Sequence, residues 1–232
     1  MLVTLQEIIQ KAEEGNYAVP AFNVYNTETV MGVLDAAEEA RSPVIMQVYP
    51  RLINQEVGYF LAPAMLAAAK KATVPVCFHL DHGAADAEVI RSLRWGATGI
   101  MFDGSNADFE ENVRHTRSIV ELCDQIGIGV EGEIGHVGSV NDEVMGDFTD
   151  PEQAAEFVRR TGVCCLAVLI GNAHGHYKKE PKLDIERVKA IRQATGGIPL
   201  VLHGGSGITD ADFQKLIRTG ITKVTVNGNE VT

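Results

Sequence analysis

Eight short apolar runs, separated by helical patterns, constrain the fold of this chain more than any other feature. The runs cover residues 17–24, 42–49, 74–80, 98–103, 127–134, 164–170, 198–204 and 222–227. Unbroken apolar runs of this length are typical of parallel strands that are buried on both faces. Glycines mark the ends of the intervening helices at Gly96, Gly127, Gly162, Gly197 and Gly220. The sequence therefore predicts a repeated strand–helix unit.

Eight such units with no change of composition predict an α/β fold, the (β/α)8 or TIM barrel, with a doubly wound open sheet as the alternative. The 232 residues fit one barrel domain over 1–232, and no linker or low-complexity segment divides them. The last predicted strand ends close to Thr232, so the eighth outer helix is absent from this sequence. Either the polypeptide is longer, or something else covers that part of the barrel.

The charge balance limits the classes of partner. Acidic residues outnumber basic ones by 31 to 20, for a net charge of −11, and no Lys/Arg-rich tract is present. We therefore expect no nucleic-acid partner and no membrane partner. The four cysteines lack metal-ligand spacing and the N-terminus lacks a basic leader, so a cytoplasmic location is expected. A phosphorylated substrate must be held by local groups such as backbone amides.

Three histidine–glycine motifs follow the third, sixth and seventh predicted strands: HLDHG at 79–83, NAHGH at 172–176 and HGGSG at 203–207. The carboxyl ends of the strands in a barrel form one rim, where active sites are built. A catalytic zinc site needs three protein ligands and an open position, and neutral imidazole suits zinc. We therefore predict His82, His174 and His203 as the ligands of one zinc ion (Zn²⁺).

At these motifs the chain resembles the class II, zinc-dependent fructose-bisphosphate and tagatose-bisphosphate aldolases. The resemblance extends along essentially the whole chain, through AFNVYNTET, MFDGS, EGEIG, AVLIGNAHGHYK, IPLVLHGGSGI and GITKVTVN. It implies a lyase of carbohydrate metabolism, including glycolysis, that cleaves or forms the C3–C4 bond of a ketose bisphosphate. The products of cleavage would be dihydroxyacetone phosphate and an aldehyde. It also implies a homo-oligomer, a dimer or a tetramer.

The resemblance assigns roles to individual residues. His82, His174 and His203 would bind zinc, and Asp81 would be the catalytic acid/base. Two carboxylates at strand ends would lie near the metal or hold it in an alternative buried position: Asp103 and Glu133. The phosphorylated substrate would be bound by Gly175, Gly204, Gly205, Ser206, Thr225 and Asn227.

The chemistry of these residues agrees with that assignment. Zinc is a Lewis acid for the ketone and adjacent hydroxyl oxygens, so no Schiff-base lysine is required, and no lysine stands at a plausible Schiff-base position. Asp81 would take the C4 hydroxyl proton in cleavage and return it in condensation, or else it would orient a histidine ligand. Gly204–Gly207, before a helix opened by Thr209, is typical of a barrel phosphate site.

Three positions depart from the family pattern. Asn141 stands where a mobile loop usually offers a proton-donating glutamate, so Asp142 or Glu143 could replace it. Tyr49 replaces a serine, and Thr225 replaces an asparagine that binds dihydroxyacetone phosphate. The default substrate is fructose 1,6-bisphosphate, with tagatose 1,6-bisphosphate or another phosphorylated ketose as alternatives.

Two other classes of function remain open at this point. A barrel metallohydrolase would use the three histidines to activate water, although no ligand set for a second metal is evident. A non-catalytic barrel would bind metal and sugar phosphate but lack the proton-transfer loop, in keeping with the three departures.

Overall fold

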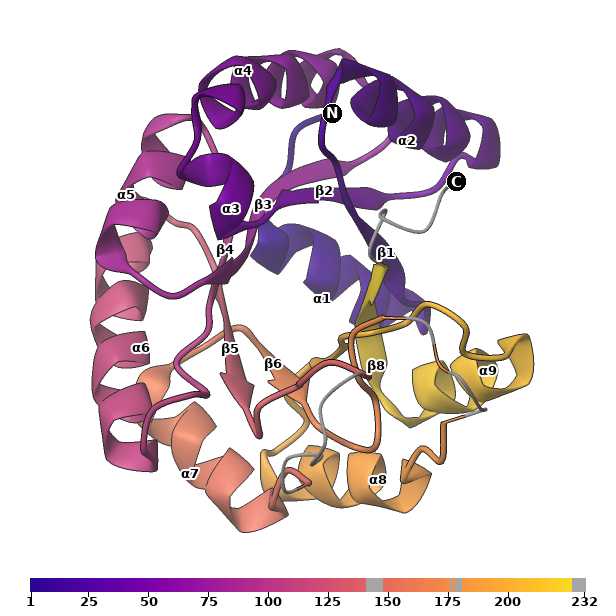
Figure 1. The fold of residues 1–232 in the computed structure, drawn as a ribbon. Helices are drawn as coiled ribbons and strands as arrows, with labels where there is room; N and C mark the ends of the chain where they lie inside the picture. Colours follow the sequence, from indigo (N-terminus) through magenta and orange to yellow (C-terminus); the bar gives the residue numbers. More distant parts are fainter. Residues whose placement is uncertain (141–147, 176, 178–180, 227–232) are drawn as a thin grey trace.

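Eight parallel strands hydrogen-bond to one another in chain order and close into a barrel in the computed structural model, which describes residues 1–140, 148–175, 177 and 181–226 (Figure 1). The first strand pairs with both the second and the last, with Ala21 opposite Ile45 on one side and Thr225 on the other. The predicted (β/α)8 barrel is thus confirmed and the open-sheet alternative is wrong. The strands are β1 Val19–Asn23, β2 Val44–Val48, β3 Val76–Gly83, β4 Gly99–Phe102, β5 Val130–Ile134, β6 Cys165–Val168, β7 Leu200–Leu202 and β8 Ile221–Val226.

Helices surround this barrel on its outside (Figure 1). They are α2 Thr27–Ala40, α3 Pro50–Ile53, α4 Glu56–Lys71, α5 Asp86–Arg94, α6 Phe109–Asp124, α7 Pro151–Thr161, α8 Ile185–Ala194 and α9 Asp210–Thr219. The predicted end signals act as expected, because Asp150 and Thr209 accept hydrogen bonds from helix amides, and Gly162 and Gly220 end α7 and α9 in the left-handed conformation. Within the described part of the chain, no helix has the length and apolar character needed to cross a bilayer.

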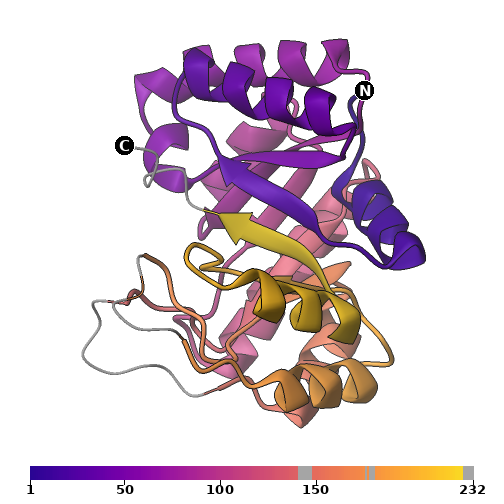
Figure 2. The same ribbon diagram turned by 90° about the vertical axis from the view of Figure 1, so that its right-hand side faces the viewer.

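The remaining helix, α1 Leu5–Gly15, covers one end of the barrel, opposite the loops that follow the strands (Figures 1 and 2). A capping box between Thr4 and Glu7 begins the helix, and its apolar side chains pack against the interior of the barrel. This apolar cluster comprises Leu5, Ile8, Ile9, Ala12, Val19, Ala21, Ile45, Cys77, Met101, Cys165, Ala167 and Val201. The end of the barrel that α1 closes is therefore filled with apolar groups.

The interior becomes polar toward the carboxyl ends of the strands. Period-two alternation directs every second side chain of a strand inward. The buried polar residues on β1, β2, β3, β5 and β8 are Asn23, Gln47, His79, Asp81, Glu131, Glu133, Thr222, Lys223 and Thr225. Burying so many polar groups is costly unless they are paired or bind a ligand. This concentration locates the site at the rim opposite α1.

Candidate functional site

The three predicted histidine ligands converge at this rim. His82 lies at the end of β3, while His174 and His203 lie in the segments after β6 and β7. One ring nitrogen from each comes within 4.8 Å of the others, and His82 Nε2 is 3.0 Å from His203 Nδ1. Zinc–nitrogen bonds of about 2.0–2.1 Å in a tetrahedron place nitrogens about 3.3–3.4 Å apart. The three rings therefore have a spacing that fits one zinc ion.

Hydrogen bonds to the outer ring nitrogens decide which nitrogens face inward. His82 Nδ1 is 2.8 Å from Asp103 Oδ2, and His203 Nε2 is 2.9 Å from Glu131 Oε1. An ionised carboxylate accepts a hydrogen bond and offers none, so in the neutral rings that bind metal His82 Nε2 and His203 Nδ1 are the nitrogens with free lone pairs. The buried Nε2 of His174 has no hydrogen-bond partner in the described part of the chain. Buried polar atoms without partners are rare, and one metal ion would satisfy His174 Nε2 together with His82 Nε2 and His203 Nδ1.

The backbone of β3 brings two consecutive side chains, Asp81 and His82, to the same site. A regular strand would direct them to opposite faces. Here the pairing of β3 with β4 shifts register between Leu80 and Gly83, and His82 has a left-handed backbone with a φ of 48°. That conformation is strained for a residue with a Cβ, and such strain and bulges are concentrated at functional sites. The irregular end of β3 thus places the carboxylate of Asp81 beside His82, one of the predicted metal ligands.

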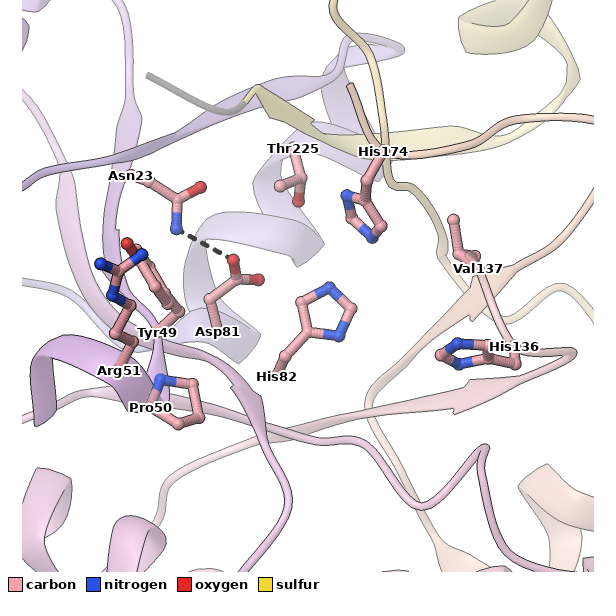
Figure 3. Close-up of a pocket in the computed structure, with 10 residues that line it drawn as sticks. All are labelled: Asn23, Tyr49, Pro50, Arg51, Asp81, His82, His136, Val137, His174 and Thr225. Carbon is pink, nitrogen blue, oxygen red and sulfur yellow. Dashed lines mark hydrogen bonds between the residues drawn. The ribbon is translucent and has the colours of Figure 1, made fainter. Parts of the chain in front are cut away.

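Asp81 is buried but keeps one oxygen free. Its Oδ2 accepts a hydrogen bond of 3.0 Å from Asn23 Nδ2 (Figure 3), and Asn23 Oδ1 in turn accepts one of 3.1 Å from Gln47 Nε2. Its Oδ1 has no partner among the described residues. Burial raises the pKa of Asp81, but the nearby positive charges, those of His82 and Lys223 among them, outweigh burial and hold the pKa below its usual value. Asp81 is therefore an oriented, ionised carboxylate with an oxygen available to accept a proton.

Two further carboxyl groups, those of Asp103 and Glu133, lie beside His82. His82, Asp103 and Glu133 form a second group with the spacing of metal ligands, and Ser105 Oγ hydrogen-bonds to both carboxylates. Burial, followed by the charge of Asp103, raises the pKa of Glu133 to about 8. Burial opposes a charge on His82, yet Asp81 and the other two carboxylates raise the pKa of His82 to about 10. The field that favours a proton on His82 also favours a divalent cation.

A cavity of about 400 Å³ opens onto these groups (Figure 3). Its lining residues are Asn23, Tyr49, Pro50, Arg51, Asp81, His82, His136, Val137, His174 and Thr225. Tyr49 and Arg51 lie on one side of Asp81 and His82, and His136 and Val137 lie on the other (Figure 3). The glycine-rich loop is not among the described lining residues.

That loop nevertheless packs against the segment that carries His174. Asn172 Nδ2 donates a hydrogen bond of 3.0 Å to the carbonyl of His203, and the Tyr177 hydroxyl donates one of 2.9 Å to the carbonyl of Gly204. Gly175 and Gly204 have φ values of 108° and 65°. A Cβ on Gly204 would lie 2.0 Å from the carbonyl oxygen of Ala173. The structure thus brings Gly175, Gly204, Gly205 and Ser206 next to the histidines without placing them in the cavity wall.

Replacing Gly204 should therefore destabilise the protein. We expect Gly204→Ala to lower the free energy of unfolding by about 1–3 kcal/mol, because it adds both left-handed strain and a clash with backbone. Gly32→Ala in α2 is the control, since nothing lies within 4 Å of its Cβ and alanine favours a helix by about 0.5–1 kcal/mol. Thermal unfolding should show a lower Tm for the first variant and a higher Tm for the second. An unchanged Tm for Gly204→Ala would refute the close approach.

Comparison with known proteins gives the family. A family model described as "Fructose-bisphosphate aldolase class-II" matches residues 3–230. The chain belongs to the class II fructose-bisphosphate aldolase family. A fructose-bisphosphate aldolase of Geobacillus stearothermophilus is 41% identical over 97% of the chain and 80% of that relative. The Escherichia coli K12 protein YdjI, named as uncharacterized, is 45% identical over 98% of the chain and 83% of its own length.

A solved structure supports the same fold. The crystal structure of the YdjI aldolase from Escherichia coli K12 matches with a TM-score of 0.89 and 43% identity, covering 98% of this chain and 82% of that chain. As a member of an aldolase family, the chain belongs with lyases. The resemblance inferred from its motifs is confirmed.

One lysine bears on the expectation that no lysine stands at a plausible Schiff-base position. Lys223 on β8 is fully buried inside the barrel. Its Nζ lies 2.6 Å from Glu131 Oε2, and although burial lowers the pKa of Lys223, the charge of Glu131 raises it above its usual value. Lys223 does not line the cavity. A protonated, paired lysine outside the cavity is a poor nucleophile.

Four of the predicted residues lie outside the described part of the chain: Asn141, Asp142, Glu143 and Asn227. Three buried residues of the site were not predicted: Asn23, which bonds to Asp81, Gln47, which bonds to Asn23, and Glu131, which bonds to His203. Each lies on a strand with its side chain buried: Asn23 ends β1, Gln47 is the last residue but one of β2, and Glu131 is the second residue of β5. A polar residue at an inward position was the signal that could have identified them.

Proposed function

We propose that this aldolase is zinc-dependent and cleaves or forms the C3–C4 bond of a phosphorylated ketose, with fructose 1,6-bisphosphate as the expected substrate. Tagatose 1,6-bisphosphate or another phosphorylated ketose is the alternative. The observation that carries the proposal is the free oxygen of Asp81 on the wall of a cavity that His82 and His174 also line. A proton acceptor and a set of metal ligands there face the same small molecule.

His82, His174 and His203 would hold the zinc ion, and Asp103 and Glu133 would offer an alternative buried position with His82. Bound zinc supplies a Lewis acid that draws electron density from the ketone oxygen. The inward nitrogens and the negative field of the carboxylates support this cofactor. Binding of zinc would require only a small movement of these side chains, because their ring nitrogens already lie close together.

Asp81 would transfer the proton. In cleavage, its free Oδ1 accepts the proton of the C4 hydroxyl as the C3–C4 bond breaks, and in condensation it returns that proton. Its lowered pKa keeps it ionised at neutral pH, so it is ready to act as a base. Asn23 holds the other oxygen, which fixes the direction of the carboxylate.

The substrate would lie between the glycine-rich loop and the cavity wall. Backbone amides of Gly175, Gly204, Gly205 and Ser206 would bind the phosphate of the dihydroxyacetone-phosphate half, and Thr225 and Asn227 would contact the same half. The buried Thr225 Oγ1 has no partner among the described residues, which supports a substrate contact. We expect the protein to act in the cytoplasm as a dimer or a tetramer on a phosphorylated sugar.

A coupled assay separates this function from its competitors. The zinc-loaded protein is given fructose and tagatose bisphosphates, with and without a chelator, and triose phosphates are measured. Metal-dependent release of triose phosphates supports an aldolase. Metal-dependent release of inorganic phosphate instead would indicate a hydrolase, and substrate binding without either product would indicate a non-catalytic barrel, which the departures at Tyr49 and Thr225 leave open.

The ligand set predicts the metal content of three variants. We expect His82→Ala, His174→Ala and His203→Ala each to lose stoichiometric zinc, because each removes one of only three ligands. Elemental analysis of folded protein measures zinc per chain. His115→Ala is the control, since His115 lies on α6, paired with Asp86, and should retain one zinc. Full zinc content in any of the three variants would remove that residue from the ligand set.

A further inference from the structure

A buried ion pair lies beneath the three histidines, on the side of α1. Glu131 on β5 and Lys223 on β8 are both fully buried, and Lys223 Nζ is 2.6 Å from Glu131 Oε2. Lys223 Nζ is also 3.1 Å from Nε2 of the buried His79 on β3. Neither Glu131 nor Lys223 lines the cavity, so neither has a direct part in the chemistry proposed for Asp81.

The other oxygen of Glu131 connects this pair to the metal ligands. Glu131 Oε1 lies 2.9 Å from Nε2 of His203, while Nδ1 of the same ring lies 3.0 Å from His82 Nε2. A carboxylate paired with an ammonium group is ionised, so His203 Nε2 must donate the hydrogen of this bond. The second nitrogen of the neutral ring, Nδ1, then keeps its lone pair directed at the site.

Lys223 holds that carboxylate in place and compensates its charge. A carboxylate fully buried without a compensating cation would be costly. Lys223 thus contacts the group of three histidines through Glu131.

We infer that Glu131 is a positioning residue that fixes His203 in the tautomer with Nδ1 free for metal, and that Lys223 anchors the other oxygen of Glu131 and compensates its charge. The inference rests on the proposed zinc centre and deepens it. Outer partners of this kind both orient a metal-bound imidazole and increase its basicity. The two members of the pair therefore differ in their expected effect on zinc affinity.

Zinc affinity, measured by competition with a chromophoric chelator at constant pH, separates the roles. Glu131→Gln should weaken zinc binding by about 10–100-fold, because an amide is a weaker acceptor and allows either tautomer. Lys223→Met removes the ammonium group but leaves the contact between Glu131 and His203, and bound zinc then supplies a cation nearby. Its zinc affinity should fall far less than that of Glu131→Gln, although the metal-free protein should be less stable.

Two further variants complete the test. The double variant Glu131→Gln/Lys223→Met removes both charges of the pair and so leaves no buried charge without a partner. It replaces Glu131→Gln in the test if that single variant fails to fold. Its zinc binding should also be about 10–100-fold weaker than that of the wild type. Glu13→Gln, which breaks an ion pair with Arg192 that contacts none of the three histidines, is the control and should bind zinc as the wild type does.

The outcomes distinguish this inference from the proposed function. Wild-type zinc affinity in Glu131→Gln or in the double variant would overturn the inference, as would an equal loss in Lys223→Met and Glu131→Gln, which would indicate a merely structural pair. A wild-type protein that binds zinc but cleaves no ketose phosphate would refute the proposed activity and leave this test intact. A wild-type protein that binds no zinc would overturn both.

Discussion

Removing the metal with a chelator should abolish cleavage of ketose phosphates, and adding zinc should restore it. Apart from the histidines, the described lining of the cavity holds one cationic side chain, Arg51, which is exposed and lies across Asp81 from His174. It is therefore poorly placed to replace a Lewis acid in stabilising the negative charge left when the C3–C4 bond breaks. The loss should therefore reach the detection limit of the assay. Circular dichroism on the same sample checks that the metal-free protein remains folded.

The same experiment tests an alternative mechanism, in which Lys223 forms a Schiff base with the substrate. A lysine that formed a Schiff base with the ketone would act without a metal. Turnover that survives complete demetallation would contradict the proposed mechanism, and trapping of the substrate on Lys223 by borohydride would then identify the amine. Because Lys223 Nζ is paired with Glu131 and lies outside the cavity lining, we expect no trapping.

Asp81→Asn should retain zinc and bind substrate but lose about 10²–10⁴-fold in kcat, the usual cost of removing a general base. Asparagine keeps the shape of the side chain, and its Oδ1 can still accept the hydrogen bond from Asn23 Nδ2. It cannot take a proton from the C4 hydroxyl. Zinc content and kcat measured on one preparation test this directly.

The opposing interpretation of Asp81 predicts a different result. If Asp81 only orients a histidine, the variant should lose zinc affinity by about 10–100-fold, and excess zinc should restore its activity. Asp108→Asn is the matched control, because Asp108 caps α6 away from the cavity and asparagine caps a helix equally well. A normal kcat in Asp81→Asn would refute the catalytic role.

The barrel could be predicted because its signals are local. Apolar runs and helix ends such as Asp150-Pro151 and Gly162 depend on neighbouring residues, and they match the observed strands and helices. The role of α1 could not be predicted in the same way. Leu5 and Ile8 form an ordinary amphipathic pattern, and only the closed barrel shows that they cover its end.

The site was predictable where residue type and motif repeat together. His82, His174 and His203 each precede or adjoin glycine at a strand end, and the structure brings their ring nitrogens together. The bulge that turns both Asp81 and His82 inward was not predictable, because register shifts depend on the pairing of β3 with β4.

The contact between the buried residues Glu131 and Lys223 could not be predicted from local sequence. Glu131 lies two residues before Glu133, and Lys223 two residues before Thr225, so alternation places each pair on the same face of its strand. Which of these charges meet depends on the closure of the barrel, since β5 and β8 are not neighbours in the sheet. Their contact is a tertiary property that no local pattern records.

The most direct test of the central claim is the release of dihydroxyacetone phosphate from a panel of ketose phosphates by the zinc-loaded protein. The panel should include fructose 1,6-bisphosphate, tagatose 1,6-bisphosphate and ketose phosphates with other groups at the far end. We predict metal-dependent release from at least one of them, with fructose 1,6-bisphosphate as the expected substrate. Zinc-loaded, folded protein that releases no dihydroxyacetone phosphate from any member of the panel would contradict the proposed aldolase activity.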